Sequence, residues 1–150
     1  MTYLIAGAFV IVLGAVLIFT LRPLGNTTQK SPTSSPSNQV QPTTSLLTTR
    51  EVTALLGEKR GDTSFAILDV RTPEEYTSGH LAGSENIDYY AADIKEKLAE
   101  LDRSKTYLVY CRTGKRSSAV ATMMESLGFT QINDLQGGIE AWKAASLPIE

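Results

Sequence analysis

Strand-like apolar runs alternate with helix-like segments through residues 46–150, and this alternation leaves few folds open. The runs Phe65–Val70 and Tyr107–Tyr110 are apolar almost without interruption, as expected for strands that are covered on both faces. A helix-like segment follows each of them. Strands that alternate with helices predict an α/β fold, in which a small parallel sheet has helices on both faces.

Two capping boxes mark the starts of helices. Thr48-Thr-Arg-Glu51 precedes apolar residues at helical spacing, and this helix is expected to end near Gly57 or Gly61. Thr72-Pro-Glu-Glu75 places proline at the first helical position of a short helix that Gly79 stops. The other predicted elements are a strand over 84–88, a helix over 91–101, a helix that follows residues 111–116 and ends at Gly128, a strand over 131–135 and a helix around 139–145.

Residues 3–21 are apolar and carry no charge. As a helix they would be about 28 Å long, close to the thickness of a bilayer core, which predicts a single-pass transmembrane helix. A secretory signal peptide is the alternative, but no basic residue precedes the run and no small-x-small cleavage pattern follows it. Arg22 and Lys30 lie on the C-terminal side, so the positive-inside rule places the following domain in the cytoplasm. Two charges are a weak bias, and an extracytoplasmic domain stays open.

Residues 22–45 are rich in Ser, Thr, Pro, Asn and Gln. Such a segment buries too little apolar surface to offset the entropy of ordering, so it is interpreted as a flexible linker. The predicted organisation is a membrane helix over 3–21, a linker over 22–45 and a globular domain over 46–150.

Charge and composition exclude several classes of function. The net charge is -2, and the 45 N-terminal residues hold two basic residues and no acidic one, so the globular part is acidic and an unsuitable nucleic-acid surface. One cysteine forbids an intramolecular disulfide, and one cysteine with one histidine is too few for a Cys/His zinc site. No metal or cofactor is expected.

The single cysteine, Cys111, lies between a predicted strand and a predicted helix. Backbone N–H groups and the positive end of a helix face a thiol at such a turn, and Arg112, Lys115 and Arg116 add positive charge. Both effects favour the reactive thiolate. The alternative is a buried cysteine that acts as a small hydrophobe. The cationic, glycine-containing surroundings favour the reactive interpretation.

Three blocks of sequence carry a resemblance to a known family. They are residues 68–87 (LDVRTPEEYTSGHLAGSENI), 109–117 (VYCRTGKRS) and 135–142 (LQGGIEAW). In this order and spacing, residues 46–148 resemble a single-domain rhodanese, a sulfurtransferase module with a three-layer α/β fold. Residues 1–45 lie outside the resemblance.

The resemblance implies covalent chemistry at Cys111. A small anionic donor such as thiosulfate gives a sulfur atom to the cysteine, and the persulfide passes it to cyanide or to a thiol, including a thiol on a partner protein. The implied loop that binds donor and persulfide consists of Arg112, Thr113, Gly114, Lys115, Arg116 and Ser117. Ser117 is expected to be the N-cap of the following helix. For each basic residue, a solvated surface turn is the alternative to a substrate contact.

The resemblance also implies that Asp69 and Arg71 flank the crevice and brace the loop, with a structural ion pair as the alternative. His80 is expected to make a structural hydrogen bond, and Trp142 to be a core residue. The domain is expected to be a monomer.

Two other functions are weighed against sulfur transfer. The Cys-x4-Arg loop is one residue shorter than the Cys-x5-Arg loop of the related phosphatases and arsenate reductases, which ranks those activities lower. A membrane-tethered sulfur carrier, or an interaction or sensor module, is the principal alternative to an enzyme.

Overall fold

The structure, a computed structural model, describes residues 42–150. Its elements are β1 (Thr43–Leu47), α1 (Thr49–Glu58), β2 (Phe65–Asp69), α2 (Pro73–Thr77), β3 (Ser84–Asn86), α3 (Ile94–Glu100), β4 (Thr106–Tyr110), α4 (Lys115–Ser126), β5 (Gln131–Leu135) and α5 (Gly138–Ala144). No helix in this part of the chain is long and apolar enough to cross a membrane. The segment 3–21, predicted to span one, lies outside the described residues.

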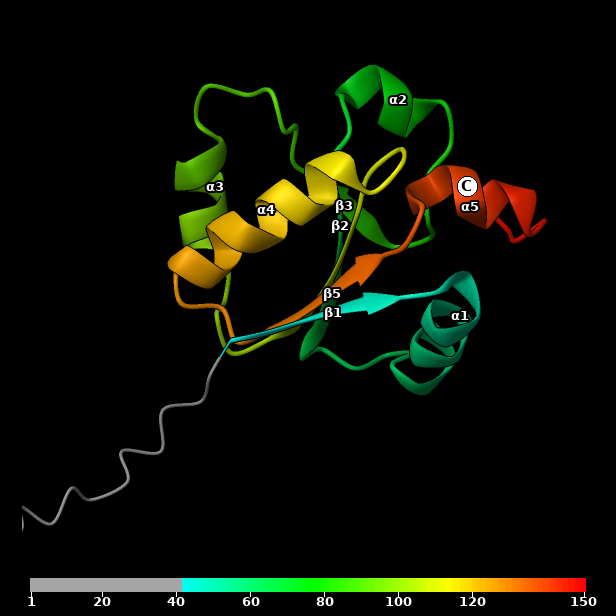
Figure 1. The fold of residues 1–150 in the computed structure, drawn as a ribbon, viewed down its shortest axis with the longest axis horizontal. Coiled ribbons are helices and arrows are strands. Elements are labelled where there is room, and N and C mark those ends of the chain that lie inside the picture. The colour runs from blue at the N-terminus through cyan, green and yellow to red at the C-terminus, as the bar shows by residue number, and fades with distance from the viewer. Residues whose placement is uncertain (1–41) are drawn as a thin grey trace, which may run out of the picture. The chain divides into compact units, whose positions relative to one another are not determined.

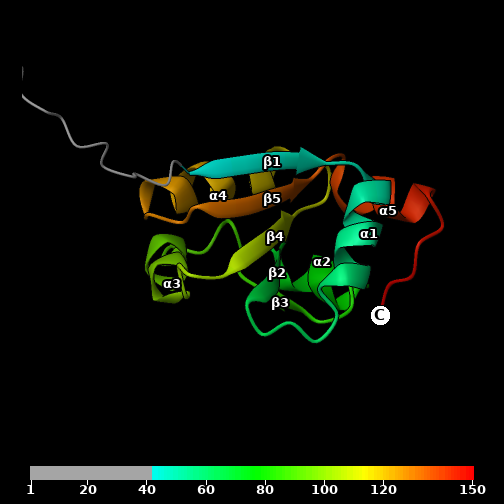
Figure 2. The ribbon, with the colours of Figure 1, turned by 90° about the horizontal axis from the view of Figure 1, so that it is seen from below.

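The five strands form one parallel sheet in the order β1-β5-β4-β2-β3. Figure 2 shows the strands side by side in this order, with β1 and β3 at the two edges. Helices lie on both faces of the sheet (Figure 1). The predicted parallel sheet with helices on both sides is confirmed.

The sheet separates two hydrophobic clusters, and β4 contributes to both. Tyr107 and Val109 pack in the cluster that includes the buried side chains of α3 and α4. Leu108 and Tyr110 point the other way, into the cluster that includes Val52 of α1 and Ile139 of α5. Adjacent strand residues face opposite sides of a sheet, so a continuous apolar strand fills both clusters.

Three helix-related expectations are confirmed. Thr48 and Thr72 each form a capping box, with Glu51 and Glu75 as the third helical residue that bonds back to the cap. Trp142 is 4% exposed and belongs to the cluster on the α1/α5 face of the sheet. The indole N–H of Trp142 donates to the Pro148 carbonyl oxygen at 2.9 Å, which fastens the end of the chain to α5.

Strand β1 was not predicted from the sequence. It pairs with β5 from Thr43 opposite Gln131 to Leu47 opposite Leu135, so the expected domain start at residue 46 falls inside the strand. Leu46 is 60% exposed, and Leu47 packs only at the margin of a cluster. The backbone ladder therefore holds β1 in place, and its Ser/Thr-rich sequence carries little strand signal.

Candidate active site

The cysteine loop is the short connection between β4 and α4. Cys111 follows the last residue of β4, and α4 begins at Lys115. Gly114, the N-cap residue of α4, has a left-handed conformation with a φ of 96°. Residues with a Cβ rarely adopt this conformation, so glycine allows the chain to turn back over the cysteine within a few residues.

Hydrogen-bond donors of the loop and of the first turn of α4 surround the Cys111 sulfur. The Gly114 N–H donates to Sγ at 3.1 Å, and the Ser117 hydroxyl lies 3.6 Å from Sγ. The backbone N–H groups of Thr113 and Ser117 also interact favourably with the sulfur. Sγ thus occupies the place of a capping acceptor at the N-terminus of a helix, where an anion is stabilised.

These contacts determine the acidity of the thiol. Cys111 is 1% exposed, and burial alone raises the pKa of a thiol. The opposing hydrogen bonds from Ser117, Thr113 and Gly114 together outweigh burial and hold the pKa of Cys111 below its ordinary value. The thiolate is the nucleophilic form of cysteine, so the loop favours the reactive state.

The expectation that Ser117 is the N-cap of α4 is wrong. The N-cap lies three residues earlier, at Gly114, because the left-handed glycine brings the chain into helical geometry by Lys115. Ser117 is therefore a buried residue of the first turn, and its hydroxyl donates to the Gly114 carbonyl oxygen at 3.1 Å. From this position the same hydroxyl also reaches the sulfur.

The start of α5 holds the cysteine loop from behind. The N–H groups of Ile139 and Glu140 donate to the carbonyl oxygens of Cys111 and Arg112, at 2.9 and 3.1 Å. A Cβ on Gly138 would lie 2.6 Å from the Arg112 carbonyl carbon and closer still to the Cys111 carbonyl oxygen. Because α5 binds these carbonyl groups on one side, the N–H groups of the loop are left facing the sulfur.

Two of the three basic residues of the loop are paired with carboxylates. Arg112, which is exposed, bonds Glu140 of α5 at 2.6 Å. Arg116 forms a two-pronged pair with Glu75 of α2 at 2.6 and 2.8 Å. Lys115 is exposed and has no ion-pair partner among residues 42–150. It is thus the loop cation that remains available to an incoming anion.

A shallow depression of about 570 Å³ opens above the loop. Its lining residues are Glu75, Tyr90, Arg112, Thr113, Lys115 and Arg116. The Arg116 guanidinium lies 5.7 Å from the Tyr90 ring centroid, so an aromatic wall faces the ion pair. A second hollow of about 520 Å³ is lined by Leu56, Phe65, Trp142 and others and includes no loop residue. The depression above the loop is therefore the candidate substrate entrance.

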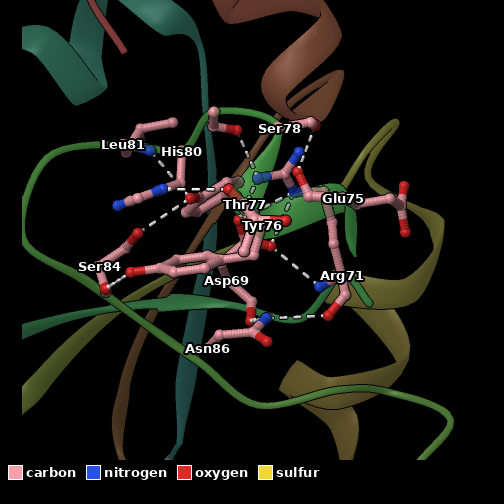
Figure 3. Close-up of polar contacts among 12 residues, drawn as sticks. Asp69, Arg71, Glu75, Tyr76, Thr77, Ser78, His80, Leu81, Ser84 and Asn86 are labelled. Atoms are coloured by element: carbon pink, nitrogen blue, oxygen red, sulfur yellow. Dashed lines mark hydrogen bonds and ion pairs between the residues drawn. The ribbon is translucent and has the colours of Figure 1, made fainter. Parts of the chain in front are cut away.

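Asp69 and Arg71 form a buried ion pair that braces the α2 region (Figure 3). The Arg71 guanidinium makes several hydrogen bonds to the Asp69 carboxylate and donates to the Gly79 carbonyl oxygen at 2.8 Å. Asn86 donates to the main-chain oxygens of both residues at 2.9 Å. Among the described contacts, none joins this pair directly to residues 111–117. The structural interpretation of the pair therefore fits its position.

His80 lies in the same network (Figure 3). Its Nδ1 is 3.1 Å from the Tyr76 carbonyl oxygen, and its ring stacks on the Tyr76 ring with centroids 3.8 Å apart. Its main chain exchanges hydrogen bonds with Glu150. The expected structural hydrogen bond is confirmed. Within residues 42–150, no cluster of three or more His, Cys, Asp or Glu side chains is arranged to hold a metal ion.

Comparison with known proteins decides the family. Residues 48–145 match the rhodanese-like domain. The chain belongs to the rhodanese-like family. It is 35% identical over 91 residues to thiosulfate sulfurtransferase 16, a chloroplast protein of Arabidopsis thaliana, a match that covers 54% of this chain and 76% of the relative. It is 35% identical over 104 residues to MoeZ of Mycobacterium tuberculosis, where the match covers 69% of this chain and 26% of MoeZ.

The fold agrees with solved structures of this family. A rhodanese-related protein from Thermoplasma volcanium superposes with a TM-score of 0.58 at 33% identity, covering 71% of this chain and 97% of the other. The rhodanese-like domain thus accounts for most of the described residues of the chain, and MoeZ is a longer protein of which this chain covers about a quarter.

Sequence reasoning missed three residues at the entrance of the rhodanese-like site. Glu75 was interpreted only as a capping residue, and Glu140 and Tyr90 were not singled out. Each lies far along the chain from the cysteine and reaches the loop only through the tertiary fold. The excess of acidic residues in the globular part hinted that loop cations have partners, but no sequence pattern identified these two glutamates.

Proposed function

We propose that this protein is a sulfurtransferase in which Cys111 carries a sulfane sulfur as a persulfide. The observation that supports this most directly is the position of Sγ, which accepts the Gly114 N–H at 3.1 Å within a ring of donors at the start of α4. Donors fixed in this way stabilise negative charge on the sulfur without reorganising. They suit a cysteine that alternates between two anionic forms, thiolate and persulfide.

The proposed reaction has two steps. The Cys111 thiolate attacks the outer sulfur of a donor such as thiosulfate, a new S–S bond forms, and the old S–S bond breaks with its electron pair leaving on sulfite. A nucleophile then attacks the outer sulfur of the persulfide and regenerates the thiolate. With cyanide as the acceptor the product is thiocyanate, and with a thiolate it is a new persulfide.

The residues around the loop take different parts in this proposal. Lys115 has no ion-pair partner among the described residues and attracts the anionic donor. Arg112 and Arg116 act as pairs with Glu140 and Glu75, so they shape the entrance and add less net charge. Asp69 and Arg71 support the scaffold beside the site. No cofactor takes part in the proposed reaction, because the sulfur is carried on the protein itself.

A sulfur carrier that delivers to a protein thiol is the second candidate. The burial of Cys111 at 1% exposure favours this acceptor class less than a small one, because a protein thiol must approach through the depression above the loop. A purely binding module has no need of a thiol whose pKa is lowered by converging donors. We therefore place catalysis first.

We also propose, from the sequence alone, that residues 3–21 anchor the domain to a membrane with the domain in the cytoplasm. The test is cell fractionation with protease protection of the full chain. Release of the whole protein by carbonate or high salt would contradict the anchor. Digestion of the domain by protease added outside intact cells would show that the domain lies on the outer side, which would reverse the proposed orientation. The proposed chemistry does not depend on either result.

Intact mass spectrometry tests the sulfurtransferase proposal. The full chain is incubated with thiosulfate and weighed before and after cyanide is added, beside Cys111→Ala and Cys111→Ser. We expect a gain of one sulfur atom that cyanide removes, and no gain in either variant. The single tryptophan, Trp142, reports whether the variants remain folded. A folded wild-type protein that gains no sulfur from thiosulfate or other small anionic donors would contradict the proposal, as would turnover in Cys111→Ala.

A further inference from the structure

A buried carboxylic acid, Asp134, lies close to the loop that contains Cys111. Asp134 is on β5 and is 3% exposed, although it is a carboxylic acid. It points to the same face of the sheet as Ile132, two residues earlier, which packs in the cluster that includes α4. This is the face on which the first turn of α4 and the Cys111 sulfur lie.

Asp134 has little to stabilise an ionised carboxylate. Its Oδ1 has no hydrogen-bond partner among the described residues, and it forms no ion pair with any of them. Burial raises the pKa of Asp134, and the Ser117 side chain opposes this only in part. Burying an unpaired carboxylate is costly, so the site shifts the Asp134 carboxyl towards its neutral form.

The neighbours of Asp134 link it to the sulfur. The side chain that interacts with its carboxyl is Ser117 of α4, and the Ser117 hydroxyl lies 3.6 Å from the Cys111 sulfur. Two other titratable groups near this face are Tyr107 of β4, whose hydroxyl donates to the Asp102 carbonyl oxygen, and Glu125 of α4, which accepts from the Thr44 hydroxyl of β1. Both are engaged elsewhere, and Ser117 is the neighbour that Asp134 shares with Cys111.

A serine hydroxyl has one hydrogen and several possible acceptors. Here the Gly114 carbonyl oxygen, the Cys111 sulfur and the Asp134 carboxyl all compete for the Ser117 hydrogen. A neutral carboxyl can donate its own proton to the Ser117 oxygen, and it then ceases to be a competitor. The Ser117 hydrogen is then free to point at the sulfur when the sulfur becomes negative.

We propose that Asp134 is a positioning residue for the sulfur chemistry: its protonated carboxyl donates to Ser117 and thereby directs the Ser117 hydroxyl to the Cys111 sulfur. Such a chain of hydrogen bonds stabilises an anion without bringing a second negative charge near it. No proton is transferred along the chain. The proposal deepens the proposed function and rests on it, because it assigns Asp134 a role in stabilising thiolate and persulfide.

The test is the pH profile of Cys111 alkylation by iodoacetamide in the full chain, in which no other cysteine reacts. We expect Asp134→Ala to shift the profile to higher pH and to slow alkylation at neutral pH by about threefold to tenfold, since one oriented donor to the thiolate is lost. Asp134→Asn keeps a donor and should rescue the wild-type profile. Ser117→Ala should slow alkylation similarly, and adding Asp134→Ala to it should have no further effect.

Ile132→Val is the structural control, because it loosens the same face of the same strand and leaves the Asp134 and Ser117 side chains unchanged. It should leave the profile unchanged. A shift of the profile to lower pH in both Asp134 variants would overturn the proposal, because it would reveal an ionised carboxylate that repels the thiolate. An unchanged alkylation profile in Asp134→Ala would also overturn the proposal. So would a double variant in which Asp134→Ala slows alkylation as much as it does when Ser117 is present.

Infrared spectroscopy keeps the proposal falsifiable if Asp134→Ala does not fold. We expect the wild-type protein at neutral pH to show the C=O band of a protonated carboxyl that Asp134→Asn lacks. Absence of this band would overturn the proposal. Neither measurement uses a sulfur donor, so a failure here is distinguishable from a failure of the persulfide experiment.

Discussion

At the scale of single residues, the chemistry depends on where a few backbone groups point. The Cys111 sulfur is stabilised by main-chain N–H groups of the loop, and these face it because α5 binds the loop carbonyl groups on the other side. Two of the three basic side chains of the loop, Arg112 and Arg116, form ion pairs with carboxylates. Reactivity therefore comes from the loop conformation more than from the basic residues.

Gly138→Ala tests this dependence on backbone packing. The new methyl group would collide with the Cys111 and Arg112 carbonyl groups, and residue 138 has a φ of 61°, which alanine disfavours. We expect a loss of about 2 kcal/mol or more in the free energy of unfolding, together with slower alkylation of Cys111 at neutral pH. Urea denaturation followed by Trp142 fluorescence and the alkylation rate measure the two effects.

Gly57→Ala is the matched control for Gly138→Ala. Residue 57 lies in α1, where nothing is within 4 Å of the added methyl group. Because alanine is the better helix former, we expect stability to rise by about 0.5–1 kcal/mol with no change in alkylation. Equal effects of the two substitutions would show that the contact at Gly138 does not support the loop.

Sequence reasoning identified Cys111 and the loop but misplaced the role of its neighbours. The strand–cysteine–glycine–helix order is local, so the thiol and its donors could be predicted from a short stretch of chain. Ser117 was wrongly expected to cap the helix, because serine is a common cap and the left-handed turn at Gly114 cannot be read from residue types alone. Asp134 passed unnoticed, since a single aspartate in a strand gives no signal of burial.

At the scale of elements, the candidate site is assembled where α2, α4 and α5 meet the end of β4. Glu75 of α2 both caps its own helix and holds Arg116 of α4, so one carboxylate fixes a helix start and joins two helices. The hydrogen bonds from Arg116 lower the pKa of Glu75 to about 2. Glutamine can keep the cap but not the charge, which allows the two roles to be separated.

Glu75→Gln should destabilise the domain by about 1 kcal/mol at neutral pH, a modest value because the pair is partly solvated. The ordinary pKa of 4.5 falls to about 2 in the folded protein, so the stabilisation is complete above pH 4.5 and is lost as pH falls through about 2. The difference between wild type and variant should therefore narrow as pH falls. Urea denaturation at several pH values measures it.

Glu140→Gln is the comparison for this experiment. Its pair with Arg112 is more exposed, with the two side chains 51% and 64% accessible, so we expect a smaller effect on stability. A difference between wild type and Glu75→Gln that stays constant down to the lowest pH at which both fold would contradict the assigned ion pair.

Most elements were predictable, and the exception is instructive. Capping boxes, apolar runs and glycine stops are local signals, and they placed α1, α2, β2, β4 and β5 close to their observed bounds. β1 has no such signal, because its residues are mostly Ser and Thr and the strand exists through its pairing with β5. Edge strands of this kind are defined by the neighbour they join.

At the scale of the whole molecule, the described residues form a sheet with a cluster on each face, and chemistry occupies one end of it. Cys111 and Val109 belong to the α3/α4 cluster, and the hollow lined by Leu56 and Phe65 is formed by other parts of the chain. The edge strand β1 pairs with β5, the strand that carries Asp134, so β5 has a neighbouring strand on each side. The folded domain therefore includes β1 and begins before residue 46, the start predicted from the sequence.

Two fragments test this boundary. A fragment over 46–150 lacks Thr43, Thr44 and Ser45, which pair with Gln131, Ile132 and Asn133, whereas a fragment over 42–150 keeps them. We expect the shorter fragment to unfold at lower urea, with a loss of about 2 kcal/mol, because the ladder beside β5 is cut. Urea denaturation of both, with the full chain as reference, measures this. Equal midpoints would show that β1 adds nothing to the stability of the domain.

The ion pairs at the entrance have a kinetic consequence. Arg112 and Arg116 are matched by Glu140 and Glu75, so the mouth of the site carries roughly the field of Lys115 alone. A single exposed charge steers diffusing anions weakly, and at physiological ionic strength its reach is about 8 Å. Capture of the donor should then vary little with salt and should follow the local supply of donor molecules. A site built in this way gains more from being held close to its source of sulfur than from long-range attraction.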